Sequence, residues 1–340
     1  MPNRSKKRLW SVLIVTWFII AAAVYISITN GTFDISVKDV VKTLLRIDPV
    51  PDHDLVIFEF RLPRIVIGAM VGFMLGIAGA VIQGITRNGL ADTGMLGINA
   101  GAGTATVVFI FLFAGQVSEL GWWSVLAMPL CGLAGGLLAV SLIFLFAKEN
   151  GRLDPQRLIL VGIAIASGFS SLTLYVSLKM NPQDFEMATV WLAGSVYSAN
   201  WTFVAAMVPW LVILVPLVWS RAYILDVFQL EENSVRSIGV SVEREKRWLL
   251  VGCVGLVSAC VAVAGSIGFV GLIAPHIARR LVGHAHMRII PVCGFIGMAM
   301  VVVGDLIGKS IFAPAQLPVG IVIAIIGVPY FVYLLFKTRG

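Results

Sequence analysis

Few residue groups in this chain have the types and spacing that catalysis would need. The segment GDLIGKS, residues 304–310, resembles a nucleotide-binding loop, but only three residues separate its first Gly from the Gly-Lys pair. A phosphate-binding loop needs four residues there, so we do not interpret the segment as one. His284 and His286 lie two residues apart in a loop, where solvation is a better interpretation than a metal site. We therefore expect no catalytic residue, no metal site and no cofactor.

A pair of arginines has spacing suited to recognition. Arg61 and Arg64 flank Leu62 and Pro63 at the start of an apolar run. Residues three apart share nearly the same face of a helix, so the pair could present two guanidinium forks outward. Such forks suit carboxylates on a partner protein or an anionic ligand. Ordinary anchoring at a membrane interface is the alternative, and the spacing leaves both open.

The elements that position these residues are predicted to lie in lipid. Of the 340 residues, 59% are hydrophobic and 13% are charged, whereas a soluble domain carries about 25% charged residues. A membrane span needs roughly 20 apolar residues. The sequence therefore predicts an all-α polytopic membrane protein of about ten transmembrane helices, with residues 1–340 as a single domain. The apolar runs cover residues 9–28, 63–86, 95–114, 122–147, 158–179, 201–220, 248–264, 267–283, 289–308 and 318–336.

The interiors of these runs contain almost no ionisable residues. A carrier driven by protons or sodium usually needs such residues near mid-membrane. Asp305 lies near the outer end of its run and His276 near the inner end of another. An ion-coupled carrier is therefore disfavoured, and either the energy comes from elsewhere or the protein is a passive pore.

The distribution of basic residues predicts the orientation. With the N-terminus inside, 18 of the 25 Lys and Arg residues fall on the cytoplasmic side and 7 fall outside. This bias predicts that both termini are cytoplasmic, with residues 29–62 as an extracytoplasmic loop. The N-terminal stretch could be a signal peptide, but its apolar part is long, so we favour a retained first span. Because the positive charges lie in short loops, the net charge of +7 is not interpreted as nucleic-acid binding.

One cytoplasmic loop and two glycine series are also informative. Residues 221–247 form a long charged, amphipathic stretch broken at Gly239, which suits two short surface helices that dock a cytoplasmic partner.

Glycines that repeat every four residues allow two helix backbones to approach closely. We expect them to pack helices within the chain. These are Gly68, Gly72 and Gly76 in one run, and Gly132 and Gly136 in another.

Four segments, in order along the chain, closely resemble the FecCD-type permeases. They are RLPR at 61–64, GAVIQGITRNGLADTGMLGINAGAG at 79–103, AVAGSIGFVGLIAPHIARRLVG at 262–283 and LPVGIVIAIIGVPYFVYLL at 317–335. The resemblance implies a type II ABC importer permease bundle in the bacterial cytoplasmic membrane. It implies a second permease subunit, identical or different, two cytoplasmic ATPase subunits and an extracytoplasmic siderophore-binding protein. The ATPases would hydrolyse the ATP, so this chain is not expected to be an enzyme.

The resemblance also assigns roles to residues. The positions that receive acidic residues of the binding protein correspond to Arg61, Arg64 and Lys309. The ATPase-coupling segment LEENSVRSIGV points to Leu230, Glu231, Glu232, Asn233, Ile238 and Gly239. The inner turn RNGLAD and its flanks point to gate and pathway residues Asn88, Leu90, Gln83 and Asn99. The family signature corresponds to Gly265, Phe269, Gly271, Pro275, His276 and Arg279.

A ferric siderophore is the expected cargo. A cobalamin or haem importer of the same family and an autonomous secondary carrier are the alternatives. An autonomous carrier would transport without ATP or partners and would tolerate loss of residues 221–247.

Overall fold

The computed structural model describes residues 2–30, 35–47, 50–94, 97–113, 122–149, 152–153, 155–230, 232–237, 239–311 and 315–337. Its fold is all-α, as predicted, apart from a two-residue antiparallel pairing of β1 (Lys148–Glu149) with β2 (Arg152–Leu153). Ten helices coincide with the ten apolar runs. They are α1 (Pro2–Thr29), α4 (Leu62–Thr86), α5 (Ile98–Leu112), α6 (Trp122–Phe146), α7 (Pro155–Ser177), α9 (Trp201–Ser220), α12 (Val242–Ala264), α13 (Val270–Val282), α14 (His286–Ile311) and α15 (Val319–Lys337).

The remaining helices are short and lie in the connections between the long ones. In the described residues, six helices are long and apolar enough to cross a membrane. At 1.5 Å per residue, α13 is only about 20 Å long, less than the roughly 30 Å of a hydrocarbon core. The short helices are α2 (Val37–Leu44), α3 (Pro51–Asp54), the π-helix η1 (Leu55–Arg61), α8 (Pro182–Leu192), α10 (Ala222–Val227) and α11 (Glu232–Ser237).

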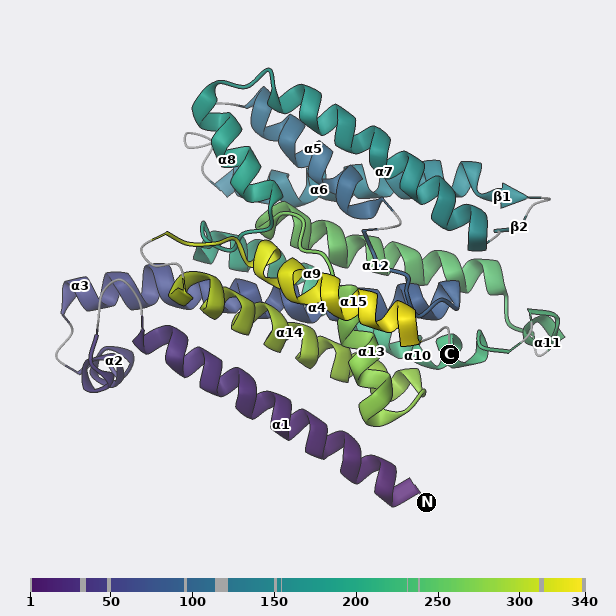
Figure 1. Cartoon of the computed structure of the whole chain (residues 1–340), viewed down its shortest axis with the longest axis horizontal. Helices are drawn as coiled ribbons and strands as arrows, with labels where there is room; N and C mark the ends of the chain where they lie inside the picture. Colours follow the sequence, from purple (N-terminus) through teal and green to yellow (C-terminus); the bar gives the residue numbers. More distant parts are fainter. Residues whose placement is uncertain are drawn as a thin grey trace.

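The two ends of the bundle differ. Figure 1 places both chain termini at the same end as α10, α11 and the β1–β2 hairpin, whereas α2 and α3 lie at the opposite end. This arrangement agrees with the predicted even number of crossings. We refer to the end with α2 and α3 as the outer end and the end with the termini as the inner end.

Helix α4 lies at the centre and approaches α14 through glycines. A Cβ added at Gly72 would overlap the carbonyl oxygen of Gly297, and one added at Gly76 would overlap that of Cys293. Gly136 likewise approaches Ser258 of α12. The prediction that these glycines pack helices within the chain is confirmed.

The outer connection is more structured than expected. Residues 51–61 form α3 and η1 and continue directly into α4, so the helix begins well before Pro63, the first residue of the apolar run. Pro63 lacks the backbone N–H that an α-helical bond to the preceding turn would use, and the wider π-helical turn before it accommodates that loss. Ile57 packs with Ile28, Ile35 and Val40, which ties this extension to α1 and α2.

Candidate functional site

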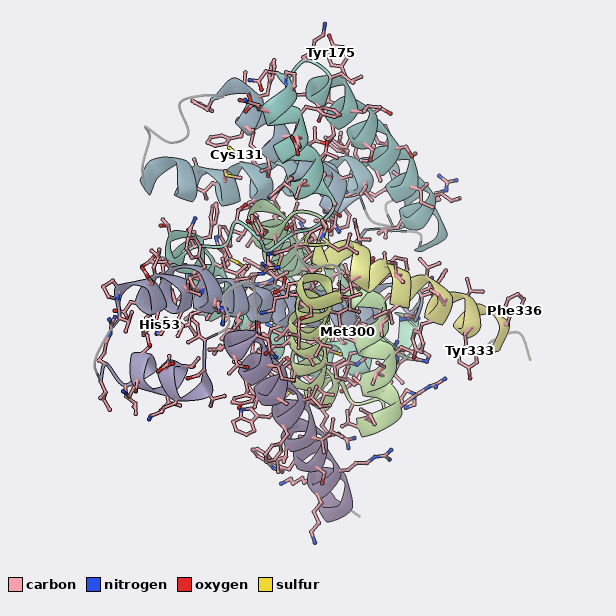
Figure 2. The ribbon with its side chains drawn as sticks, turned by 60° about the vertical axis from the view of Figure 1, so that its left-hand side comes forward. His53, Cys131, Tyr175, Met300, Tyr333 and Phe336 are labelled. Atoms are coloured by element: carbon pink, nitrogen blue, oxygen red, sulfur yellow. The ribbon has the colours of Figure 1, made fainter. Side chains whose placement is uncertain are left out.

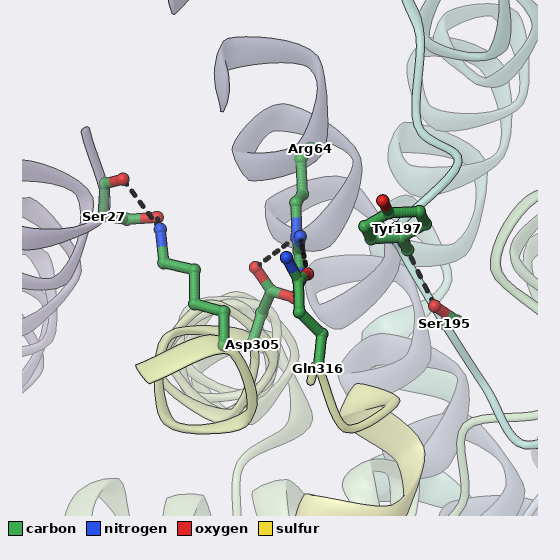
Figure 3. A network of polar contacts seen from close by, with 7 residues as sticks. Ser27, Arg64, Ser195, Tyr197, Asp305 and Gln316 are labelled. Carbon is green, nitrogen blue, oxygen red and sulfur yellow. Dashed lines mark hydrogen bonds and ion pairs between the residues drawn. The ribbon is translucent and has the colours of Figure 1, made fainter. Parts of the chain in front are cut away.

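A polar network joins four segments at the outer end of the bundle (Figure 3). Arg64 donates from Nε to both carboxylate oxygens of Asp305, at 3.0 and 2.9 Å, and from Nη2 to Oδ1 at 2.8 Å. Its Nη1 donates to Oε1 of Gln316 at 2.6 Å. The guanidinium also lies over the Tyr197 ring, 5.6 Å from its centroid. The Arg64 side chain is only 14% exposed and that of Asp305 only 7%.

Arg61 and Lys309 both contact the C-terminal end of α1. The last carbonyls of a helix have no partner within the helix. At the end of α1, Lys309 donates to the Ser27 carbonyl at 2.7 Å and to its hydroxyl at 2.6 Å, and Arg61 donates to the Ile28 carbonyl. Cations also suit the negative end of a helix dipole. Both residues therefore hold the end of α1 against the outer ends of α4 and α14.

These contacts change one expectation. The idea that both arginine forks point outward is wrong for Arg64, because Asp305 and Gln316 occupy its fork. Local sequence could not indicate this pair, since Asp305 is 241 residues away from Arg64 and only the fold brings the two together. Docking of a partner protein at this end of the molecule stays a prediction.

A cavity of about 530 Å³ lies among α5, α7 and α8, which Figure 1 shows grouped on one side of the core. None of its 13 lining residues is charged. Some of them have hydroxyl or amide side chains and the others are apolar. Two buried polar atoms in this lining, Oδ1 of Asn99 and Oγ of Ser177, have no hydrogen-bond partner among the described residues. Such atoms call for water or a ligand. The polar lining residues are Asn99, Ser170, Thr173, Ser177, Thr189 and Ser266.

Helix α8 was missed in the sequence, although a local signal marks its start. Asn181 caps the helix by accepting from the Asp184 N–H at 2.8 Å, and Pro182 occupies the first turn. Asn followed by Pro is a common way to begin a helix. Because Thr189 and Leu192 of α8 line the cavity, the helix is part of the site.

The predicted pathway residues do not all meet at this cavity. Asn99, at the start of α5, lines it and donates to Ser266 at 3.4 Å. Gln83 is instead buried within α4, where Arg279 donates to its side-chain oxygen, and it lies 3.4 Å from the Gly271 carbonyl. Gln83 therefore joins α4 to α13 rather than lining the cavity.

The predicted gate residues form a fixed turn at the inner end of α4. Arg87 ends the helix in the left-handed region, with φ of 53°. The Asn88 side chain then accepts from the Leu90 N–H at 3.0 Å, and its carbonyl accepts from Ala91 at 3.1 Å. This side-chain bond holds the turn at a place without proline. Asn88 and Leu90 are half-buried at this end.

Asp92, in the same turn, was not singled out from the sequence. Its Oδ2 accepts from the Gly94 N–H at 3.4 Å, and its Oδ1 faces Gly271 in the first turn of α13. Burial raises the pKa of this carboxyl, and backbone hydrogen bonds from Thr93 and Gly94 oppose that effect. The ionised form of an acidic side chain is stabilised beside the N-terminal, positive end of a helix.

The predicted signature residues shape the break between α12 and α13. Gly265 has φ of 69° and approaches the Trp191 carbonyl so closely that a Cβ would overlap it. Phe269 has φ of 65° and precedes α13. Pro275 lies inside α13, and the His276 ring contacts that of Tyr330 edge-on, with centroids 5.9 Å apart. These residues bring the start of α13 into the bundle, where Gly271 meets Gly79 of α4.

The loop predicted to dock a cytoplasmic partner contains the two expected short helices. Asp226 of α10 accepts from the His286 backbone at 2.8 Å and pairs with its ring at 2.6 Å. Leu225 packs beside Gly84 of α4. Further along, Leu230 is 52% exposed and Gly239 turns with φ of 81°. The base of the loop is thus fixed to α4 and α14 while Leu230 faces outward.

Part of the predicted coupling segment cannot be placed. Glu231 and Ile238 lie outside the described residues. Glu232 and Asn233 begin α11. Their coupling role stays a prediction.

The chain is similar to known proteins in both sequence and structure. The FecCD transport family matches residues 19–337. The iron-uptake system permease protein FeuC of Bacillus subtilis is 53% identical over 93% of this chain and 94% of its own length. The iron(3+)-hydroxamate import system permease protein FhuG of the same organism is 43% identical over the whole of both chains. A solved inward-facing ABC transporter, described as metal-chelate type, has a TM-score of 0.80 at 27% identity and covers 97% of this chain and 99% of its own.

Proposed function

Because the chain belongs to the FecCD transport family, we propose that it is the membrane-spanning permease subunit of an ATP-driven importer that moves a ferric siderophore across the bacterial cytoplasmic membrane. The observation that carries this proposal is the uncharged, hydroxyl-lined cavity among α5, α7 and α8. A chelate passing through it can exchange hydrogen bonds with water for bonds to Asn99 and Ser177, whose buried polar atoms lack protein partners. With no charge in the lining to hold the chelate, binding stays weak and release is easy.

Relatives with iron cargo support the choice of substrate. FeuC is named for iron uptake and FhuG for import of iron(3+)-hydroxamate. Both match this chain over at least 93% of its length. A ferric chelate is therefore preferred over cobalamin and haem.

The partners follow from the two ends of the bundle. At the inner end, residues 221–247 receive two ATPase subunits, with the exposed Leu230 as one contact. At the outer end, a siderophore-binding protein docks near Arg61 and Lys309. Both termini lie on the ATPase side.

A second permease subunit is proposed to pack against α15. This helix exposes an apolar face that includes Ile325, Ile326 and Val332. Figure 2 shows Tyr333 and Phe336 projecting from its last turns, and they are 51% and 75% exposed. Lipid is the other surface that can cover such a face.

The transport step itself involves no covalent chemistry in this chain. The loaded binding protein delivers the chelate to the outer end, and ATP binding in the partners shifts α10 and α11. Since Asp226 fixes α10 to the start of α14, that shift reaches the inner ends of the long helices and the turn at Asn88. The pathway then opens to the cytoplasm.

Capture of partners tests this proposal. The tagged full chain is purified from its native membrane in mild detergent and the co-purifying proteins are identified. An ATPase with a second permease copy or homologue is the expected result. Recovery of the chain alone, active in liposomes without ATP, would establish an autonomous carrier instead.

A further inference from the structure

Helix α2 at the outer end has three faces of different character. On the first, Val40 and Thr43 are buried, and Val40 packs with Ile28 of α1 and Ile57 of η1. The second face is apolar but exposed, and its residues share one side of the helix because they lie three or four positions apart. We call it the outer stripe, and it consists of Val37, Val41, Leu44 and Leu45, which are between 42% and 64% exposed. The third face carries the charged residues Lys38, Asp39 and Lys42.

Contacts at both ends fix the orientation of α2. At its start, the Ser36 hydroxyl accepts from the Asp39 N–H at 3.2 Å and donates to the Asp39 carboxylate at 2.7 Å. Just beyond its end, Arg46 pairs with Asp54, and the Arg46 guanidinium lies over the Phe58 ring, 4.5 Å from its centroid. The outer stripe therefore keeps one direction relative to the bundle.

Helix α2 lies crosswise at the edge of the bundle. Figure 1 shows it nearly end-on beside the outer end of α1, whereas α1 and α4 run across the view. Helix α1 is long and apolar enough to cross the membrane, and it exposes apolar side chains such as Trp17, Phe18 and Ile26. This edge of the bundle therefore borders lipid. A helix that lies crosswise at the end of a span runs along the membrane surface.

Aromatic residues mark the depth at which α2 lies. Tyr and Trp are enriched where the membrane meets water. The exposed Tyr25 lies one turn before Ile28, against which Val40 of α2 packs. The exposed Trp201 at the start of α9 donates from Nε1 to the Phe58 carbonyl of η1 at 2.7 Å. Helix α2 is therefore at the level of the outer aromatic residues.

The pattern of side chains on α2 fits this depth. An exposed apolar face beside a basic one is typical of helices that lie in the membrane interface. Lys38 borders the outer stripe, and a long lysine side chain can reach the headgroup phosphates while its neighbours meet acyl chains. Lipid therefore suits the outer stripe better than water does.

We propose that α2 is an interfacial helix of the outer leaflet, with the outer stripe against the lipid acyl chains and Lys38 among the headgroups. Because Val40 joins α2 to α1 and η1, this contact sets the depth of the outer end of the bundle in the bilayer. The proposal concerns this chain and the surrounding lipid, and it goes beyond the proposed function.

Spin labels on single cysteines test the depth of the outer stripe. Val41→Cys and Leu45→Cys place labels in the stripe. Lys42→Cys is the control on the charged face of the same helix, and Phe18→Cys on α1 is the lipid reference. The background carries Cys131→Ser, because the other three cysteines are buried. The permease assembly is reconstituted in bilayers of phosphatidylcholine and phosphatidylglycerol, and collisions of each label with oxygen, which concentrates in lipid, are compared with collisions with a water-soluble nickel chelate.

The expected result is a difference between the two exposed faces. The ratio of oxygen to nickel collisions for Val41→Cys and Leu45→Cys should be several-fold above that for Lys42→Cys and close to that for Phe18→Cys. Equal ratios at the three positions on α2 would overturn the proposal. So would nickel access to the stripe that is lost only when the binding protein is added, since the stripe would then be a docking surface. Magnetic broadening by a label on a second permease copy would assign the stripe to a subunit contact and would also overturn it.

A second measurement uses the unaltered chain, in case a labelled variant fails to assemble. The assembly is reconstituted with a phospholipid that carries a photoactivatable diazirine in its acyl chain, and the modified peptides are identified by mass spectrometry. Adducts should form on the outer stripe as well as on α1. Adducts on α1 with none on α2 would contradict the proposal. Neither measurement needs ATP or a chelate, so failure of the proposed function would leave the expected result unchanged.

Discussion

Replacing Gly72 with alanine probes the contact between α4 and α14 on which the bundle is built. The added Cβ would overlap the Gly297 carbonyl oxygen and would lie 2.7 Å from its carbonyl carbon and 2.9 Å from the Met298 Cα. Because all three are backbone atoms, no side-chain rotation relieves the overlap. The two helix backbones must therefore move apart.

The size of the effect follows from two opposing terms. Overpacking costs about 1–3 kcal/mol, and we take about 3 kcal/mol because the obstacle is backbone. Alanine in place of glycine within a helix regains about 1 kcal/mol. The net loss is about 2 kcal/mol, which at roughly 2 °C per kcal/mol lowers the apparent Tm by about 4 °C.

The chain offers a matched control one turn earlier. A Cβ at Gly68 would meet only the Val301 Cγ1, at an ordinary 3.6 Å. Gly68→Ala should therefore be neutral or stabilising by up to about 1 kcal/mol. The assay is loss of the monodisperse peak after heating in one detergent at one heating rate, because unfolding of such proteins is commonly irreversible. Equal Tm values for Gly68→Ala and Gly72→Ala would refute the packing argument.

Two further predictions concern the cavity and the inner loop. Asn99→Leu should lower chelate uptake several-fold without loss of Tm, because it removes the polar group at the start of α5 that lines the cavity. Thr106→Val on the same helix, whose hydroxyl donates to the Ala102 carbonyl, should leave uptake unchanged, and equal losses would contradict a pathway role. Asp226→Asn weakens the charge-assisted contact of α10 with His286, so ATP hydrolysis per chelate transported should rise. An unchanged ratio would show that this contact does not couple the loop to α14.

Much of the architecture could be predicted from the sequence because each helix that crosses a lipid bilayer needs a long run of apolar residues. Long apolar runs between charged loops gave all ten of the main helices, and the Gly72–Gly76 spacing correctly indicated close packing. Local signals also predicted the turn at Gly239. The turn depends on residues close to it in sequence, and the spans depend on continuous apolar runs. Both can be recognised without knowing the fold.

The parts that could not be predicted depend on contacts between distant segments. Arg64 was expected to face outward because its partner Asp305 lies on a helix far along the chain. The contacts of Gln83 with Arg279 and the α13 backbone could not be predicted either, since they join separate helices, and its pathway role stays a prediction. The sequence around Asp92 indicates a solvated turn, but in the fold the start of α13 packs beside this residue.

The most direct test of the account is uptake by the complete assembly in proteoliposomes. Iron-55 in a panel of ferric siderophores, with haem and labelled cobalamin alongside, is supplied with the binding protein and internal ATP. The account predicts that a ferric siderophore accumulates inside only when both ATP and the binding protein are present. Accumulation by this chain alone without ATP, or accumulation of haem or cobalamin in place of every ferric siderophore, would contradict it.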